Sequence, residues 1–214
     1  MLLAVVFATP AFAQSTNWNG PYVGLNVGHG SGKGWEDAFD VKSVKGNVGG
    51  IEAGYDWRKN NVVFGIAGDM SASGVKGTET TVRSYTSSFD DYTSRTETTR
   101  KVALDRLGTI RGRLGYAAKD FLLYVTGGLA LARVKTDVAN QSSSTYEGIS
   151  RSDAYGYKEV RNATGWVFGG GVEYAINRDF TVKAEYLRTE MQDMYGGAAV
   201  APLNILRAAG QYRF

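Results

Sequence analysis

The sequence contains no cysteine and a single histidine, His29. The lack of cysteine excludes disulfide frameworks, thiolate metal sites and cysteine nucleophiles, and one histidine cannot build a multi-histidine metal site. Proline is scarce, at 3 of 214 residues, and no apolar run approaches the roughly 20 residues of a membrane-spanning helix. Charge of one sign is also lacking, because 24 lysines and arginines face 21 aspartates and glutamates. No basic stripe therefore indicates nucleic-acid binding.

Glycine and aromatic residues are abundant instead. The chain has 28 glycines, about double the average usage, together with 13 tyrosines and 9 phenylalanines. Disordered low-complexity chains tend to be rich in both glycine and proline, whereas here glycine alone is high. This combination favours a β-sheet protein in which neighbouring backbones approach closely.

The first residues, MLLAVVFATPAFA, are typical of an export signal. Leu2–Ala8 forms an apolar segment, and Ala11–Ala13 presents the small-x-small pattern that signal peptidase cleaves. The basic start of such a signal is missing, so we expect the natural start to lie upstream. The prediction is a signal peptide over residues 1–13, cleaved during export, and one domain over residues 14–214; a buried first strand or helix is the alternative.

Apolar and polar residues alternate with a period of two through most of the remaining chain, which predicts β-strands. Each segment is long enough for the roughly 9–11 residues of a tilted membrane strand. The eight predicted strands are Tyr22–Gly30, Asn47–Trp57, Val62–Ser71, Val102–Tyr116, Phe121–Val134, Gly165–Ala175, Phe180–Arg188 and Leu203–Phe214.

Short and long connections take turns along the chain. The short ones are Arg58–Asn61, Ala117–Asp120 and Ile176–Asp179, and the long ones are Ser31–Lys45, Ala72–Lys101, Lys135–Asn162 and Thr189–Pro202. In an antiparallel sheet, this order puts all tight turns at one end and all long loops at the other. Parts of the second and third long connections also alternate, so we expect some strands to project past the core.

Alternation alone does not tell a soluble barrel, with its apolar face inside, from a membrane barrel, with its apolar face in lipid. The polar face is rich in glycine, which suits a narrow interior, and it carries charges of both signs in similar number. We therefore predict an ion network inside the barrel, in which Arg111 and Arg113 pair with carboxylates such as Asp69 and Glu52. The predicted members are Glu52, Asp56, Asp69, Arg111, Arg113, Glu173, Lys183, Glu185 and Arg207.

Aromatic residues of the apolar face gather beside the short turns, as in the aromatic belt of a membrane–water interface. They are Tyr55, Trp57, Tyr116, Phe121, Tyr174, Phe180, Tyr212 and Phe214. The chain ends at Phe214, in step with Tyr212. Such an ending is how bacterial outer-membrane barrels mark themselves for the insertion machinery, so Tyr212 and Phe214 are the predicted insertion signal.

Several segments together resemble the small outer-membrane β-barrel proteins of alphaproteobacteria, of the 25- and 31-kilodalton surface antigen type. They are NWNGPYVGLNVGHG, LGTIRGRLGYA, LLYVTGGLALARV, GWVFGGGVEYAI, TVKAEYL and the final YRF. The resemblance implies an eight-stranded up-and-down transmembrane barrel with short periplasmic turns and long extracellular loops. It also implies an outer-membrane location in a Gram-negative cell and a role in envelope integrity and surface contacts. Arg106 departs from the pattern, since an aromatic residue is expected there.

Other functions remain open at this stage. A small-solute porin is possible, although open lumens belong to barrels of 16 or more strands. Haem or a host ligand is possible at the loops, with His29 near Trp35 as an axial ligand; otherwise no cofactor is expected. An enzyme is not expected, since nothing orders His29, Ser31 and Asp37 as a catalytic group. Outer-membrane lipid and lipopolysaccharide are the expected partners, and the cations near the loop rim that can meet lipopolysaccharide phosphates are Lys101, Arg106, Arg133 and Lys135.

Overall fold

The computed structural model describes residues 18–35, 41–87, 92–193 and 199–214, and these form nine antiparallel strands. The predicted signal peptide over residues 1–13 lies outside the described residues. The strands are β1 (Gly20–Trp35), β2 (Val41–Lys59), β3 (Val62–Ser73), β4 (Lys76–Ser87), β5 (Tyr92–Ala118), β6 (Phe121–Tyr146), β7 (Ile149–Ala175), β8 (Phe180–Asp193) and β9 (Ala199–Arg213). Across this part of the chain, no helix is long and apolar enough to cross a membrane.

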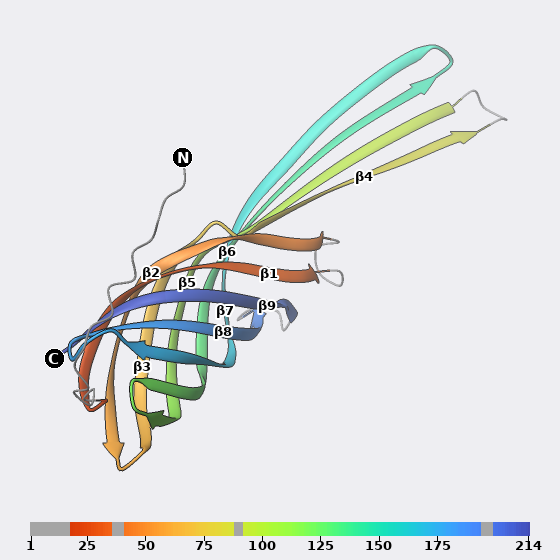
Figure 1. Ribbon diagram of the computed structural model, residues 1–214. Helices are drawn as coiled ribbons and strands as arrows, with labels where there is room; N and C mark the ends of the chain where they lie inside the picture. The colour runs from red at the N-terminus through yellow and green to blue at the C-terminus, as the bar shows by residue number, and fades with distance from the viewer. Residues whose placement is uncertain (1–17, 36–40, 88–91, 194–198) are drawn as a thin grey trace, which may run out of the picture.

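Eight of the strands close into a barrel (Figure 1). The ring runs β1-β2-β3-β5-β6-β7-β8-β9, and it closes where β9 pairs with β1, from Tyr22 opposite Arg213 to Gly32 opposite Leu203. Every pairing is antiparallel. The predicted all-β, eight-stranded up-and-down barrel is therefore confirmed. Strand β4 stands outside the ring and pairs with the upper part of β5.

Strands β5, β6 and β7 continue past the ring and form, together with β4, a four-stranded sheet that we call the arm (Figure 1). The arm consists of residues 76–87, 92–103, 135–146 and 149–160, paired in that order. The predicted loops Ala72–Lys101 and Lys135–Asn162 are therefore mostly strand. The reason is that threonine, serine and tyrosine alternate along them, favour extended backbone and pair across strands, as Thr80 does with Thr99.

Several predicted strands were shorter than the observed ones. β1 and β2 extend into the predicted loop Ser31–Lys45, and β8 and β9 extend into Thr189–Pro202. Two of the predicted short turns shrink for the same reason, since only Asn60–Asn61 and Lys119–Asp120 separate their strands. The third, Ile176–Asp179, separates β7 from β8 as predicted. We call the end with these turns the turn end, and the opposite end the arm end. The C-terminus lies at the turn end (Figure 1).

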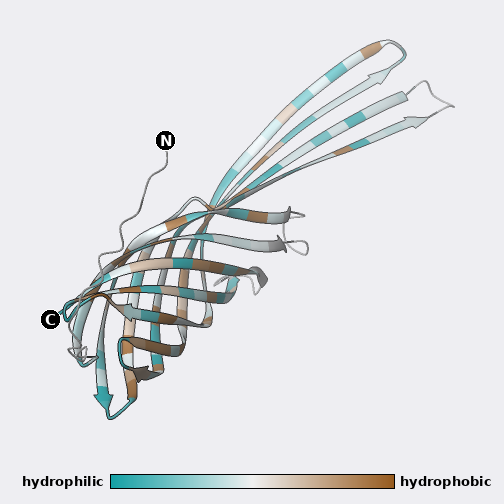
Figure 2. Ribbon diagram, viewed as in Figure 1, coloured by the Kyte–Doolittle hydropathy of each residue, from teal (hydrophilic) through white to brown (hydrophobic). Residues whose placement is uncertain are grey.

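Successive residues of each barrel strand point to opposite sides of the wall. Leu122 is fully buried while Leu123 is 67% exposed, and Ile205 is 1% exposed while Leu206 is 64% exposed. The outward positions are mostly apolar, and the inward positions hold every buried charge of the barrel. Figure 2 shows this alternation of hydropathy along the barrel strands and the paler, more polar arm. The barrel thus faces outward with the apolar side chains that a soluble barrel would bury.

The interior is layered, which the sequence analysis did not anticipate. At the turn end, Trp18 covers a small apolar cluster with Val63, Leu122 and Tyr124. At the arm end, a larger cluster includes Val75, Leu107, Leu187 and Ile205. The charged residues lie between these two apolar layers.

Candidate functional site

Glycines on the inner wall make room for the large polar side chains of the interior. A Cβ built on Gly54 would meet the ring of Tyr22, and one on Gly65 would meet the carboxylate of Asp56. A Cβ on Gly171 would lie 2.7 Å from the hydroxyl oxygen of Tyr124. Glycine is needed at these positions because the neighbouring strand or side chain occupies the space of any β-carbon.

Four charges near the turn end form a closed ring, which we call the first ion cluster. The Arg113 guanidinium lies 2.7 Å from a Glu173 carboxylate oxygen and 3.0 Å from one of Asp56. Arg213 contacts the other oxygens of the same two carboxylates, each at 2.9 Å. All four residues are buried. Each cation therefore lies between two anions, and each anion between two cations.

Aromatic rings cover the first ion cluster. The Arg113 guanidinium lies 4.7 Å from the ring centre of Tyr124 and 5.3 Å from that of Tyr22. Arg213 lies 4.8 Å from the ring centre of Trp18. Guanidinium groups stack favourably on aromatic faces. Trp18 therefore closes the turn end with an apolar body while also contacting a buried cation.

Six charges nearer the arm end form a second ion cluster. Arg111 contacts Asp69 at 2.9 Å and Glu185 at 2.8 Å, and Arg207 contacts the same two carboxylates. Lys183 contacts Glu52 at 2.8 Å. Neutral groups complete the bonding: Gln211 donates to Glu52, Tyr124 donates to Glu185, and Thr109 donates to Asp69.

The two clusters hold five carboxylates and five cations, all of them buried. Equal numbers of each sign allow every charge to be paired, which a low-dielectric interior requires. All nine residues predicted from the sequence lie in these clusters, and Arg111 does contact Asp69. Glu52 contacts Lys183 and not an arginine of β5. The positions of β8 and β9 opposite β5 across the barrel decide these pairings, and alternation along single strands carries no information on them.

Sequence reasoning left several interior residues out of the predicted network. Arg213 is not among the predicted members, although its contacts with Asp56 and Glu173 close the first cluster. Tyr22, Tyr124 and Gln211 were not singled out, because aromatic and amide residues on a polar face also occur at solvent-exposed positions. Their common signal is the inward register set by their neighbours in each strand.

His29 lies on the outer wall of the barrel, and its ring nitrogen Nδ1 is 3.0 Å from the side-chain oxygen of Asn47 on β2. This position is exposed and does not face the interior. The side chain of Trp35, expected near His29, is outside the described residues, as is Asp37. In the described ranges, no group of histidine, aspartate or glutamate side chains could hold a metal ion.

The aromatic residues predicted at the turn end all lie exposed on the outer wall. Several of them contact an aromatic ring on a neighbouring strand: Phe121 contacts Tyr174, Phe180 contacts Tyr212, and Trp57 stacks on Phe64, which was not among the predicted residues. Phe214 packs edge-on against Tyr212 with 4.9 Å between ring centres, and its backbone N–H donates to the Pro21 carbonyl.

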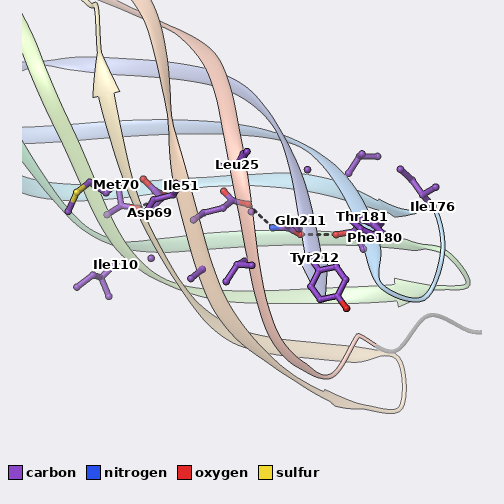
Figure 3. Close-up of a pocket in the computed structure, with 18 residues that line it drawn as sticks. Leu25, Ile51, Asp69, Met70, Ile110, Ile176, Phe180, Thr181, Gln211 and Tyr212 are labelled. Atoms are coloured by element: carbon purple, nitrogen blue, oxygen red, sulfur yellow. Dashed lines mark hydrogen bonds between the residues drawn. The ribbon is translucent and has the colours of Figure 1, made fainter. Parts of the chain in front are cut away.

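The outer wall is not smooth. A furrow of about 940 Å³ runs across β5, β3, β2, β1, β9 and β8 (Figure 3). Ile110, Met70, Ile51 and Leu25 are among its apolar lining residues, and Gly68 and Gly210 leave space on the outer face. Its lining is almost entirely apolar, so it suits hydrocarbon chains.

The rim at the arm end carries charges that are not part of the interior clusters. Lys135 donates a hydrogen bond of 2.9 Å to Asp105, which lies beside Arg106. This bond, together with the neighbouring positive charges, lowers the pKa of the Asp105 carboxyl below its ordinary value.

Comparisons with known proteins found outer-membrane β-barrel proteins. The family described as outer membrane protein beta-barrel domain matches residues 1–211. The 31 kDa outer-membrane immunogenic protein of Brucella melitensis is 33% identical over 200 residues, which cover 86% of this chain and 75% of the relative. The 25 kDa outer-membrane immunogenic protein of Brucella canis is 24% identical and is covered to 68%, against 83% of this chain. The attachment invasion locus protein Ail of Yersinia pestis is a similar solved structure, with a TM-score of 0.44, 15% identity and coverage of 91% of this chain and 99% of Ail.

Proposed function

The chain belongs to the outer-membrane protein β-barrel family, and from that premise we propose that it is a sealed membrane anchor. In this proposal the barrel stabilises the outer membrane and holds the arm at the cell surface, where the arm contacts other molecules. The observation that carries the proposal is the filled interior, in which two balanced ion clusters lie between two apolar layers. An eight-stranded barrel is narrow enough for side chains to fill it.

The arm supports the surface part of the proposal. Its four strands are paired along their length and extend the barrel wall outward, so they present a defined surface. Tyr85, Tyr146, Tyr155 and Tyr157 are exposed on it. Two relatives carry the word immunogenic in their names. We infer that the arm is the main surface antigen of this chain.

Whether the barrel is closed to ions can be tested directly by measuring its conductance. Purified protein in a planar lipid bilayer is expected to give no stable conductance steps, because two ion clusters and two apolar layers occupy the described interior of the barrel. An open porin in the same bilayer serves as the positive control. Reproducible steps of one size, proportional to voltage, would support a small-solute porin instead.

His29 remains the only residue proposed for haem, since the chain has no other histidine. Its exposed position beside Asn47, on the outer wall, gives haem one axial contact and no enclosing pocket among the described residues. A haem difference spectrum that is the same for the wild type and for His29→Ala removes this site.

Tyr212 and Phe214 are proposed as the signal for the insertion machinery, with their packed rings at the turn end as support. Replacing Phe214 by alanine is expected to lower the amount of assembled barrel in the outer membrane several-fold. The same variant refolded in detergent should unfold at nearly the wild-type urea concentration, because the Phe214 side chain is 70% exposed. An equal loss in both measurements would indicate a structural role for Phe214 instead.

A further inference from the structure

Two arginines face each other on the outer wall at the arm end of the barrel. Arg106 on β5 is directly opposite Arg133 on β6, and both side chains are exposed, with that of Arg106 at 70%. A bulge at Asp105 shifts the register just before Arg106, and bulges at barrel rims redirect side chains. Like charges directly opposite on antiparallel strands repel each other. An anion bound between Arg106 and Arg133 would offset this repulsion.

The described surroundings supply only part of that negative charge. Asp105 lies 4.0 Å from Arg106, but its shorter contact, 2.9 Å, is with Lys135. Asp137 on the same face pairs with Lys158 at 3.4 Å. Lys101 adds a further exposed cation opposite Asp137. We call Lys101, Arg106, Arg133 and Lys135 the rim cation group, and it has more positive charge than its carboxylates neutralise.

A furrow of about 1040 Å³ starts immediately on the membrane side of this group, and its lining is mainly apolar but includes the polar residues Thr164, Glu190 and Gln192. Its lining includes Met70, Gly108, Leu131 and Trp166 on the outer wall. Gly108 and Leu131 are each two residues from an arginine of the pair, on the same face, which is about 7 Å along a strand. The furrow lies in the apolar band that faces lipid, and the rim cation group lies where that band ends.

We propose that this rim binds one phosphorylated glycolipid of the outer leaflet, with phosphate on Arg106 and Arg133 and an acyl chain in the furrow. Guanidinium groups bind phosphate oxygens through two parallel hydrogen bonds, and basic residues next to a bilayer attract anionic headgroups. The positive charge of the rim and its place at the edge of the apolar band together favour a phosphorylated lipid. A neutral lipid fits the furrow, but it leaves the positive charges of Arg106 and Arg133 without a counter-charge. The site does not depend on whether the barrel is sealed.

The test measures binding of diphosphorylated lipid A to the full chain in detergent by native mass spectrometry. The double variant Arg106→Gln with Arg133→Gln is expected to bind about tenfold more weakly than the wild type, and lipid A without phosphates is expected to bind both equally weakly. The matched control removes two exposed cations at the turn end, Lys59→Gln with Arg178→Gln, and should leave affinity unchanged. Heat-modifiable gel mobility confirms that each variant is folded.

A second pair of variants tests the furrow. Gly108→Leu fills it without a backbone clash, since a Cβ there meets only the Asp69 carbonyl oxygen at 3.6 Å, and it should weaken lipid A binding. Gly112→Leu places the same side chain on β5 but outside the furrow, so it should leave lipid A binding unchanged. Equal lipid A affinity in the wild type and the double arginine variant would overturn the proposal. Phosphatidylglycerol binding as tightly as lipid A would overturn the glycolipid assignment.

Discussion

Replacing Glu173 by leucine is expected to lower the free energy of unfolding by about 3–5 kcal/mol, the usual cost of removing one partner from a buried ion pair. Glu173 is completely buried and accepts hydrogen bonds from both Arg113 and Arg213. Its loss leaves two guanidinium groups in a low-dielectric interior with Asp56 as their only remaining carboxylate in the first ion cluster. Urea unfolding in detergent, followed by heat-modifiable gel mobility, measures the change.

The matched control for this prediction is Glu97→Leu. Glu97 is a partly exposed residue of β5 in the arm, outside the barrel, so its replacement should change stability by less than about 0.5 kcal/mol. Similar unfolding midpoints for the two variants would mean that the first ion cluster does not stabilise the barrel.

Replacing Gly169 by alanine is expected to destabilise the barrel by about 1–3 kcal/mol or more, because it overpacks the inner wall. A Cβ at this position would meet the Tyr186 carbonyl oxygen on β8 and would lie 2.9 Å from a methyl carbon of Leu187. Neither the backbone of β8 nor the fully buried Leu187 can move away easily. The same urea titration measures the effect.

Gly210→Ala provides the comparison, since a Cβ on Gly210 meets nothing within 4 Å. This outward position should tolerate alanine, with stability unchanged or raised by up to about 1 kcal/mol, because alanine restricts the unfolded chain. A Gly210→Ala variant as unstable as Gly169→Ala would show that glycine acts through strand flexibility instead of through interior space.

The barrel could be predicted from the sequence because its two faces differ at nearly every alternate position. The segment from Phe121 to Val134 already shows which residues face lipid, and the short turns fix the direction of each strand. The arm was mostly assigned to loops because its strands have no apolar face. There the alternation is between different polar residues, such as threonine and arginine on β5, and it carries little hydrophobic signal.

The sequence predicted which residues belong to the ion network of the interior, but not which of them contact each other. Charge balance on one face indicates an ion network, but it does not say that Arg113 on β5 contacts Glu173 on β7 and not Glu52 on β2. Those contacts depend on the stagger of all eight strands. The inward apolar layers were missed for a related reason: Leu187 and Ile205 lie inside predicted strands as single apolar residues on the polar face, and only the neighbouring strands complete the layer.

The most direct measurement of barrel orientation compares adjacent methyl groups in lipid nanodiscs. Magnetisation transfer from lipid acyl-chain protons should reach the methyl groups of Leu123 and Leu206 and should not reach those of Leu122 and Ile205, which lie one residue away on the inner wall. Transfer to Leu122 and Ile205, with none to Leu123 and Leu206, would contradict a barrel that faces lipid with its apolar side.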